Sequence, residues 1–257
     1  MIRPDLRLAG LAALLLGGCE PAVPERDAPP SRPAATVAAD RPELGLFTTL
    51  PIYWGEGDFA TLLEESGERD WVRAELEREF ELVPLDTVEE DALAGLDRVL
   101  LAQPRALAPS ENVALDSWIA QGGRAVILAD PMATRHSSYA IGDRRRPQDV
   151  VLLSPILARW GLELRFDAAQ PSGERMVAVP GGEVPVDLAG SFALGEDADP
   201  SIAECRISAG GLVAECERGK GRVTLYADAA LLDWEGAGEA PEARRQALDL
   251  AVSPLAE

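Results

Sequence analysis

The chain has 257 residues, 47% of them hydrophobic, which is enough for one domain with a substantial core. Its formal charge of −20, from 44 acidic and 24 basic residues, argues against nucleic acid as a partner, because that binding depends on Lys and Arg that neutralise phosphates. Such acidity most often only keeps a protein soluble.

The first residues have the pattern of a bacterial lipoprotein signal. Two arginines precede an apolar run from Leu8 to Leu16, which is shorter than the roughly 20 residues of a membrane-spanning helix. The run ends in Leu-Gly-Gly-Cys, which resembles the lipobox, whose cysteine receives a diacylglycerol and becomes the mature N-terminus. We therefore predict a signal peptide at residues 1–18, a membrane anchor through lipid on Cys19, and a periplasm-facing location in the cell envelope.

A tether is predicted at residues 19–43. This segment is rich in Pro, Ala and charged residues, and it has no aromatic residue and no apolar period. Because it cannot bury a core, we expect an extended chain that reaches at most about 75 Å. A single α/β domain is expected over residues 44–257.

Short apolar runs alternate with helical stretches from residue 44 onward. Ser110, which follows Pro109, is the expected N-cap of one helix, and Gly122-Gly123 is its expected end. The alternation predicts an α/β fold with a mainly parallel, doubly wound sheet. Strands are expected at 44–54, 81–86, 98–104, 124–131 and 162–167, and helices at 68–80, 88–96, 110–121 and 150–161.

The pattern changes after residue 168. Apolar runs joined by Gly-rich turns at 175–188, 204–217 and 219–234 predict antiparallel β-hairpins over residues 168–226 that extend or cover one edge of the sheet. A helix at 240–252 is expected to close the domain.

Two cysteines lie in one of these hairpins. If Gly210-Gly211 forms a two-residue turn, Cys205 faces Cys216 at a hydrogen-bonded pair, with Cα atoms about 5.5 Å apart. Two interpretations stay open: a disulfide, which an oxidising periplasm permits, or two reduced and partly buried thiols. A metal site is not expected, since no histidine lies nearby.

The sequence does not contain a recognisable catalytic motif. There is no G-x-S-x-G elbow, and the only histidine, His136, stands beside two serines in a loop where no third, orienting group is evident. The glycines do not form a nucleotide-binding pattern. We predict no catalytic residue and no cofactor, and we expect His136 to be a solvated loop residue.

Aspartates follow two of the apolar strands. Asp130 and Asp228 should lie at the carboxyl edge of the sheet, where ligands of open α/β sheets bind. Together with Asp143 and Asp233 they raise the idea of a metal site, but aspartate after a strand is also an ordinary capping or turn residue. No metal site is therefore predicted.

The loop after the first strand, PIYWGEGDF, combines aromatic residues and carboxylates around two glycines. Two interpretations are open: the loop contacts a ligand or partner, or its aromatic rings only cover the edge of the sheet. The second interpretation is favoured. The candidate ligand or partner contacts at this edge are Trp54, Glu56, Asp58, Gln103, Asp130, Arg135, His136 and Asp228.

Three stretches, LDSWIAQGGRAVILADP, LLSPILARWGLEL and GKGRVTLYADAALLDW, together resemble the GldG-like auxiliary proteins of ABC transporters. The resemblance covers roughly residues 44–234 and rests on framework residues. It implies a flavodoxin-like or class I glutamine amidotransferase-like domain without the nucleophile, which works beside an ABC permease and ATPase outside the cytoplasm. The chain departs from the family in its anchor, because family members usually carry transmembrane helices.

These observations lead to one expectation and two alternatives. We expect a non-enzymatic, lipid-anchored accessory or binding component of an ABC transport system. The first alternative is a degenerate or unusual hydrolase that uses acidic residues at the sheet edge. The second is a structural envelope lipoprotein that has no part in transport.

Overall fold

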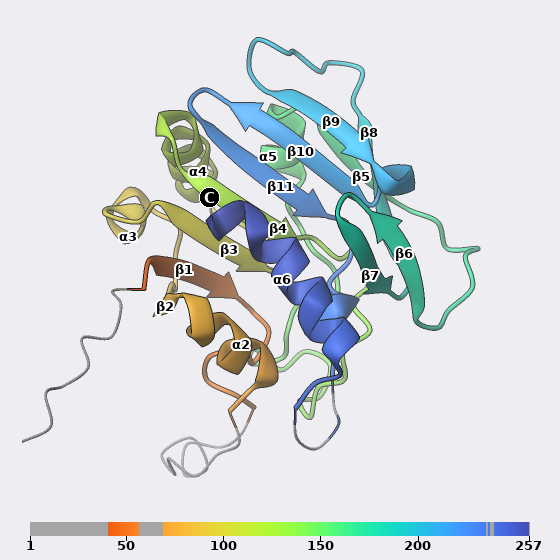
Figure 1. The fold of residues 1–257 in the computed structure, drawn as a ribbon. Helices are drawn as coiled ribbons and strands as arrows, with labels where there is room; N and C mark the ends of the chain where they lie inside the picture. The colour runs from red at the N-terminus through yellow and green to blue at the C-terminus, as the bar shows by residue number, and fades with distance from the viewer. Residues whose placement is uncertain (1–40, 57–68, 235, 237–238, 257) are drawn as a thin grey trace, which may run out of the picture. The chain divides into compact units, whose positions relative to one another are not determined.

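The computed structural model describes residues 41–56, 69–234, 236 and 239–256 (Figure 1). The described residues belong to one compact unit that starts at residue 40. The predicted signal peptide and Cys19, nearly all of the predicted tether, and Asp58 lie outside the described residues.

A seven-stranded main sheet forms the centre of the domain. Its order is β2-β1-β3-β4-β11-β10-β9. The strands β2, β1, β3, β4 and β11 run parallel to one another, and β10 and β9 extend the sheet in antiparallel pairing. The predicted mainly parallel α/β sheet with an antiparallel extension is confirmed. The strands are β1 (Glu43–Thr48), β2 (Glu81–Pro84), β3 (Arg98–Ala102), β4 (Arg124–Leu128), β9 (Glu204–Ser208), β10 (Val213–Arg218) and β11 (Gly221–Tyr226).

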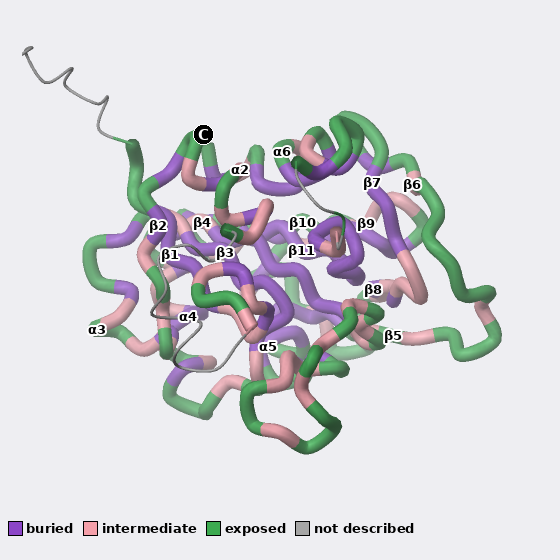
Figure 2. The backbone as a smooth tube through the Cα atoms, turned by 90° about the horizontal axis from the view of Figure 1, so that it is seen from below, coloured by how far each residue is buried: buried purple, intermediate pink, exposed green. Residues whose placement is uncertain are grey.

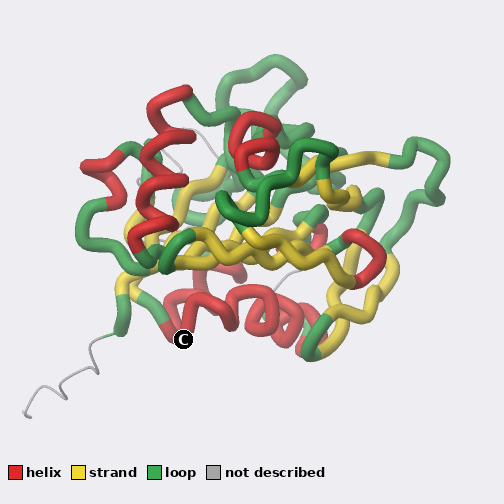
Figure 3. The backbone as a smooth tube through the Cα atoms, turned by 90° about the horizontal axis from the view of Figure 1, so that it is seen from above, coloured by secondary structure: helices red, strands yellow, loops and turns green. Residues whose placement is uncertain are grey.

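Helices cover both faces of this sheet (Figure 3). One layer holds α2 (Trp71–Glu79) and α6 (Glu242–Ala256), and α6 packs on β3 and β4. The other layer holds α3 (Glu90–Leu93), α4 (Pro109–Gln121) and α5 (Ser154–Arg159), with α4 packed against β11. The strands in the middle are therefore buried, while the exposed residues lie mainly at the periphery (Figure 2).

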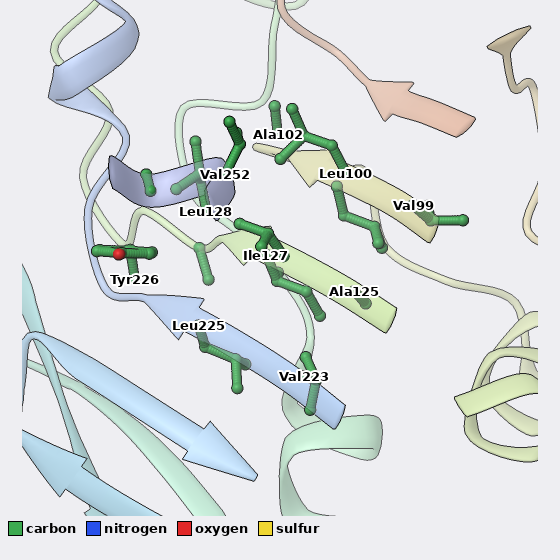
Figure 4. Close-up of a cluster of buried hydrophobic side chains, with 14 of the residues drawn as sticks. Val99, Leu100, Ala102, Ala125, Ile127, Leu128, Val223, Leu225, Tyr226 and Val252 are labelled. Carbon is green, nitrogen blue, oxygen red and sulfur yellow. The ribbon is translucent and has the colours of Figure 1, made fainter. Parts of the chain in front are cut away.

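The core lies where the parallel strands are buried on both faces. Val99, Leu100 and Ile127 are fully buried, and Val223 and Leu225 of β11 lie on the same face of the sheet as Val99 and Ile127 (Figure 4). Continuous apolar runs of this kind suit a strand that has helices on both sides.

The predicted fifth parallel strand is wrong. β5 (Leu162–Phe166) pairs antiparallel with β8 (Gly190–Leu194) in a separate two-stranded sheet, and β11 takes the expected position beside β4. The physical reason is the burial pattern, because Glu163 and Arg165 of β5 are exposed on one face. A strand that is apolar on one side suits an outer sheet.

The first predicted hairpin forms its own sheet. β6 (Arg175–Val179) and β7 (Gly182–Val186) pair antiparallel, which confirms the predicted hairpin. The two strands do not join the main sheet, so the prediction that this hairpin extends it is wrong. The extension of the main sheet consists only of β9 and β10, so the predicted range 168–226 mixes three different sheets.

Several predicted element boundaries differ in the structure, and β1, α4 and α5 are examples. β1 ends at Thr48, and the chain turns before Trp54; α5 has only six residues. Helix α4 begins at Pro109 rather than after Ser110. Its first turn is capped by Glu111, whose Oε2 accepts a hydrogen bond from the N–H of Ala108 at 2.7 Å, and proline suits the first helical position because it has no N–H to satisfy.

The end of α4 follows the prediction. Gly122 has φ +130°, a conformation that favours glycine, and it stops the helix. A Cβ at Gly123 would overlap the ring of Trp118. Both glycines are therefore required for the tight passage into β4.

Cys205 and Cys216 are joined by a disulfide between β9 and β10. The predicted register is present, since the two residues are paired across the ladder. The connection is longer than predicted, because Ser208 pairs with Val213 and the turn between them is not a two-residue one. The Cα atoms are 4.0 Å apart, closer to the spacing of a non-hydrogen-bonded pair than to the predicted 5.5 Å.

Candidate functional site at the carboxyl edge of the sheet

Gln103 connects the loops that leave the central strands. It follows β3 directly, is fully buried and has φ +44°, in the left-handed region that few non-glycine residues adopt. Its Nε2 donates to the carbonyls of Asp130 at 3.0 Å and Gln148 at 2.9 Å, and its Oε1 accepts from the N–H of Asp130 at 2.9 Å. The side chain therefore holds the loop after β4 against the end of β3.

Asp130 ties the loops after β4 and β11 together. Its Oδ1 accepts from the N–H of Met132 at 2.8 Å, and its Oδ2 accepts from the N–H of Ala229 at 3.1 Å. The residue is only 1% exposed. Both carboxylate oxygens are thus bonded to backbone amides, of which that of Ala229 is buried.

Asp228 has the same role at the end of the neighbouring strand, β11. Its Oδ1 accepts from the N–H of Ala230 at 2.6 Å, and its Oδ2 accepts from the N–H of Asp187 at 3.1 Å. The residue is 2% exposed. It joins the loop after β11 to the segment between β7 and β8.

Three carboxyl groups at this edge titrate at unusually high pH. Burial raises the pKa of Asp130 to about 6. Burial, together with the charge of Asp130, raises the pKa of Asp228 to about 8. Burial also raises the pKa of Asp233 to about 7, against the opposing charge of Arg135. The edge therefore gathers carboxyl groups whose charged form is disfavoured by burial, so that they are partly protonated near neutral pH.

This geometry is that of a structural clamp. Raised carboxyl pKa values are common at catalytic sites, but a catalytic carboxyl must also reach its substrate. Asp130 and Asp228 reach backbone amides and are closed off from solvent. Over the described ranges, no group of three or more His, Cys, Asp and Glu residues has an arrangement that would hold a metal ion.

A second group of predicted residues lies on the loops outside the clamp. Glu56 accepts hydrogen bonds from both the N–H and the hydroxyl of Ser138, at 2.7 and 2.6 Å. These bonds and the charge of Arg135 lower its pKa against the effect of burial, which is the largest single influence. His136 is exposed in the same loop. The structure therefore brings the loop after β1 and the loop after β4 together.

Arg135 is committed to a structural contact. Its guanidinium forms an ion pair with Asp70 at 2.9 Å, and it also donates to the carbonyl of Leu232 at 3.3 Å. Asp70 caps the first turn of α2 through its bond with the N–H of Val72 at 2.9 Å. Arg135 thus links three segments and does not face an open ligand site.

A shallow pocket of about 270 Å³ opens at the carboxyl ends of β1 and β2. Trp54 stands at its rim, 70% exposed, with its ring 4.7 Å from that of Tyr53 in an edge-on arrangement. The side chains that carry polar or aromatic groups into the lining are Thr48, Thr49, Tyr53, Trp54, Glu56, Asp86, Tyr139 and Arg145.

Tyr139 and Arg145 are among the members of this pocket that the sequence analysis did not identify. Tyr139 lies under the guanidinium of Arg145, 4.3 Å from ring centroid to carbon, and Arg145 also pairs with Asp143 at 2.8 Å. Arg145 belongs to a run of three arginines at 144–146, and nothing in the sequence placed this run beside the end of β1. The predicted covering role of Tyr53 and Trp54 is only half right, since Trp54 is largely exposed.

Comparison with protein families finds one match. The model of a family described as "ABC-type uncharacterized transport system" matches residues 41–185, more than half of the chain. No curated protein sequence matches the chain. Among the helices that the structure describes, none combines the length and the apolar content that crossing a membrane requires.

Several solved structures share part of the fold at low identity. An exo-β-1,4-mannosidase from Opitutaceae bacterium strain TAV5 is 15% identical, with 75% of this chain and 32% of that one covered and a TM-score of 0.42. A β-galactosidase from Rahnella sp. R3 is 14% identical, with coverages of 84% and 31% and a TM-score of 0.47. A ThuA-like protein from Bacteroides uniformis is 9% identical, with coverages of 86% and 93% and a TM-score of 0.40. The chain thus spans about a third of the length of the two glycosidases.

Proposed function

The chain belongs to the ABC-type uncharacterized transport system family, and on this premise we propose that it is a non-enzymatic, lipid-anchored accessory subunit of an ABC transport system in the bacterial envelope. The observation that carries the proposal is the family match over residues 41–185. This match supports an auxiliary component that works at a membrane-bound transporter.

The non-enzymatic character is supported by the clamp at the sheet edge. An enzyme on this fold would use groups at the carboxyl ends of the strands. Here Asp130 and Asp228 hold loops together through backbone amides and are inaccessible to a substrate. The strand order 2-1-3-4 with β11 as the next parallel strand supports a flavodoxin-like fold used as a scaffold.

The anchor is proposed from the sequence. The lipobox ending in Cys19 and the Pro-rich segment 20–43 are together typical of a lipoprotein whose domain is held off the membrane by a tether. Replacing Cys19 with Ser should move the protein from the membrane fraction to the periplasmic fraction. If the variant stays with the membrane as the wild type does, the anchor is not the lipid.

Partner contacts are proposed for the loops around Trp54 and Glu56. A largely exposed tryptophan next to a pocket with charged and aromatic walls is typical of a contact surface, because aromatic rings supply much area at a small entropic cost. Trp54→Ala should weaken partner recovery without lowering the free energy of unfolding.

One observation favours a hydrolase as the second candidate. The raised pKa values of Asp130 and Asp228 would suit a general acid near neutral pH. A hydrolase should lose activity in Asp130→Asn while staying folded, whereas an accessory subunit has no such activity to lose.

The deciding experiment is affinity purification of the tagged full-length protein from detergent-solubilised membranes, followed by identification of the co-purified proteins. Recovery of an ABC permease or ATPase, absent from a control with an unrelated tagged lipoprotein, is expected. Recovery of neither would refute the proposed function and would leave a structural envelope lipoprotein as the better interpretation.

A further inference from the structure

A cavity lies on the helix layer that α3, α4 and α5 form. It is a groove of about 960 Å³ between α3 and α4, which lie side by side on one face of the sheet (Figures 1 and 3). Its floor is apolar, formed by Leu93, Leu96 and Trp118. Trp118 is fixed there because its Nε1 donates to the carbonyl of Leu96 at 3.0 Å.

The wall contributed by α4 carries no charge. Ser110, Val113, Ala114, Ser117 and Gln121 recur three or four residues apart, so they form one face of the helix, and all five line the groove. Val113 in its middle is 68% exposed. Next to the apolar floor, this uncharged face with its exposed valine offers apolar area that a partner can bury.

The charges of the groove all have one sign. Its charged lining residues are Glu89, Glu90 and Asp97, and no Lys or Arg lines it. Glu89 also accepts a hydrogen bond from the hydroxyl of Ser110 at 2.7 Å, which ties the start of α3 to the start of α4. The acidic residues therefore border an apolar floor, and they favour a basic partner.

We propose that the groove between α3 and α4 binds an amphipathic helix of a partner protein, with apolar side chains on the floor and Lys or Arg beside the acidic border. A helix fits better than an extended peptide, because two helices flank the groove and no strand edge offers backbone groups to a peptide there. The proposal adds a docking site to the proposed accessory role. Only the expectation that the partner belongs to the transport system rests on that role.

A designed peptide tests the groove directly. The probe is a helical peptide with Leu at helical spacing on one face and Lys flanking that face, and its binding to the purified chain is measured by fluorescence anisotropy. Val113→Lys should weaken binding about tenfold or more, because it removes an apolar contact and adds a repelling charge. Val150→Lys is the matched control, since Val150 is 45% exposed, lies outside the groove and undergoes the same change.

Three results would overturn the proposal. Equal weakening by Val113→Lys and Val150→Lys would mean that the peptide responds only to the net charge of the protein. Equal binding of a Leu/Glu peptide with the same pattern would remove the role of the acidic border. A dimer in solution that Val113→Lys dissociates would assign the groove to a second copy of the chain.

The same variants separate this proposal from the proposed function. If wild type and Val113→Lys recover permease or ATPase equally from solubilised membranes, the accessory role stands and the groove is not the contact used. If the peptide binds as expected and no transporter component is recovered, the groove is a docking site and the transport role fails. Circular dichroism of Val113→Lys should match the wild type, because the side chain points to solvent.

Discussion

Replacing Asp130 with Ala tests whether the sheet edge is a clamp or a reaction site. The substitution leaves the buried N–H of Ala229 and the partly exposed N–H of Met132 without their acceptor. Orphaning the buried amide of Ala229 costs about 1–3 kcal/mol, and the amide of Met132 adds little because water reaches it, so the free energy of unfolding should fall by about 1–3 kcal/mol. Asp130→Asn keeps one acceptor oxygen and should lose about half as much.

The loss should depend on pH in a defined direction. Burial raises the pKa of Asp130 from 3.8 to about 6, so in the wild type the ionised form opposes folding above that pH. Asp130→Ala is therefore expected to be more damaging at pH 5 than at pH 8. The assay is urea unfolding followed by circular dichroism at both pH values.

An exposed aspartate provides the control. Asp91→Ala on α3 should change the free energy of unfolding by no more than about 0.5 kcal/mol. If Asp130→Ala is as stable as Asp91→Ala, the carboxylate is not a clamp, and the argument against an enzymatic role of this edge fails.

Three further predictions concern stability. Reducing the Cys205–Cys216 disulfide should cost about 3 kcal/mol, and an unchanged melting temperature in dithiothreitol would contradict this. Because the pKa of Asp228 is raised to about 8, the free energy of unfolding of the wild type should fall as the pH rises from about 5 to about 8. Asp228→Asn should flatten this pH dependence. An equal pH dependence in the wild type and the variant would contradict the prediction. Arg105→Ala leaves buried Glu111 without its ion-pair partner and should lower the free energy of unfolding by about 2–3 kcal/mol. This is less than for a fully buried pair, because Arg105 is 38% exposed and its charge is screened by solvent. Urea unfolding tests this, with Arg105→Lys as the milder control.

The sequence alone determined the class of the domain. The alternation of apolar strands and helices, the Gly-Gly stop of α4 and the continuous apolar runs of β3 and β4 are local signals, since each follows from burial or backbone conformation within a few residues. The pairing of Cys205 with Cys216 could also be predicted from the sequence, because the sum of paired residue numbers is constant along a hairpin. The place of Asp130 and Asp228 after two strands was visible because each follows an apolar run.

Only the tertiary structure decided what these residues do. The choice of β11 over β5 as the neighbour of β4 depends on which strand can be buried on both faces, and that is a competition between segments far apart in the chain. The partners of the carboxylates are backbone amides of distant loops, as in the bond between Asp130 and Ala229, and backbone amides carry no sequence signal. The groove between α3 and α4 could not be predicted from the sequence, because it exists only where the two helices meet.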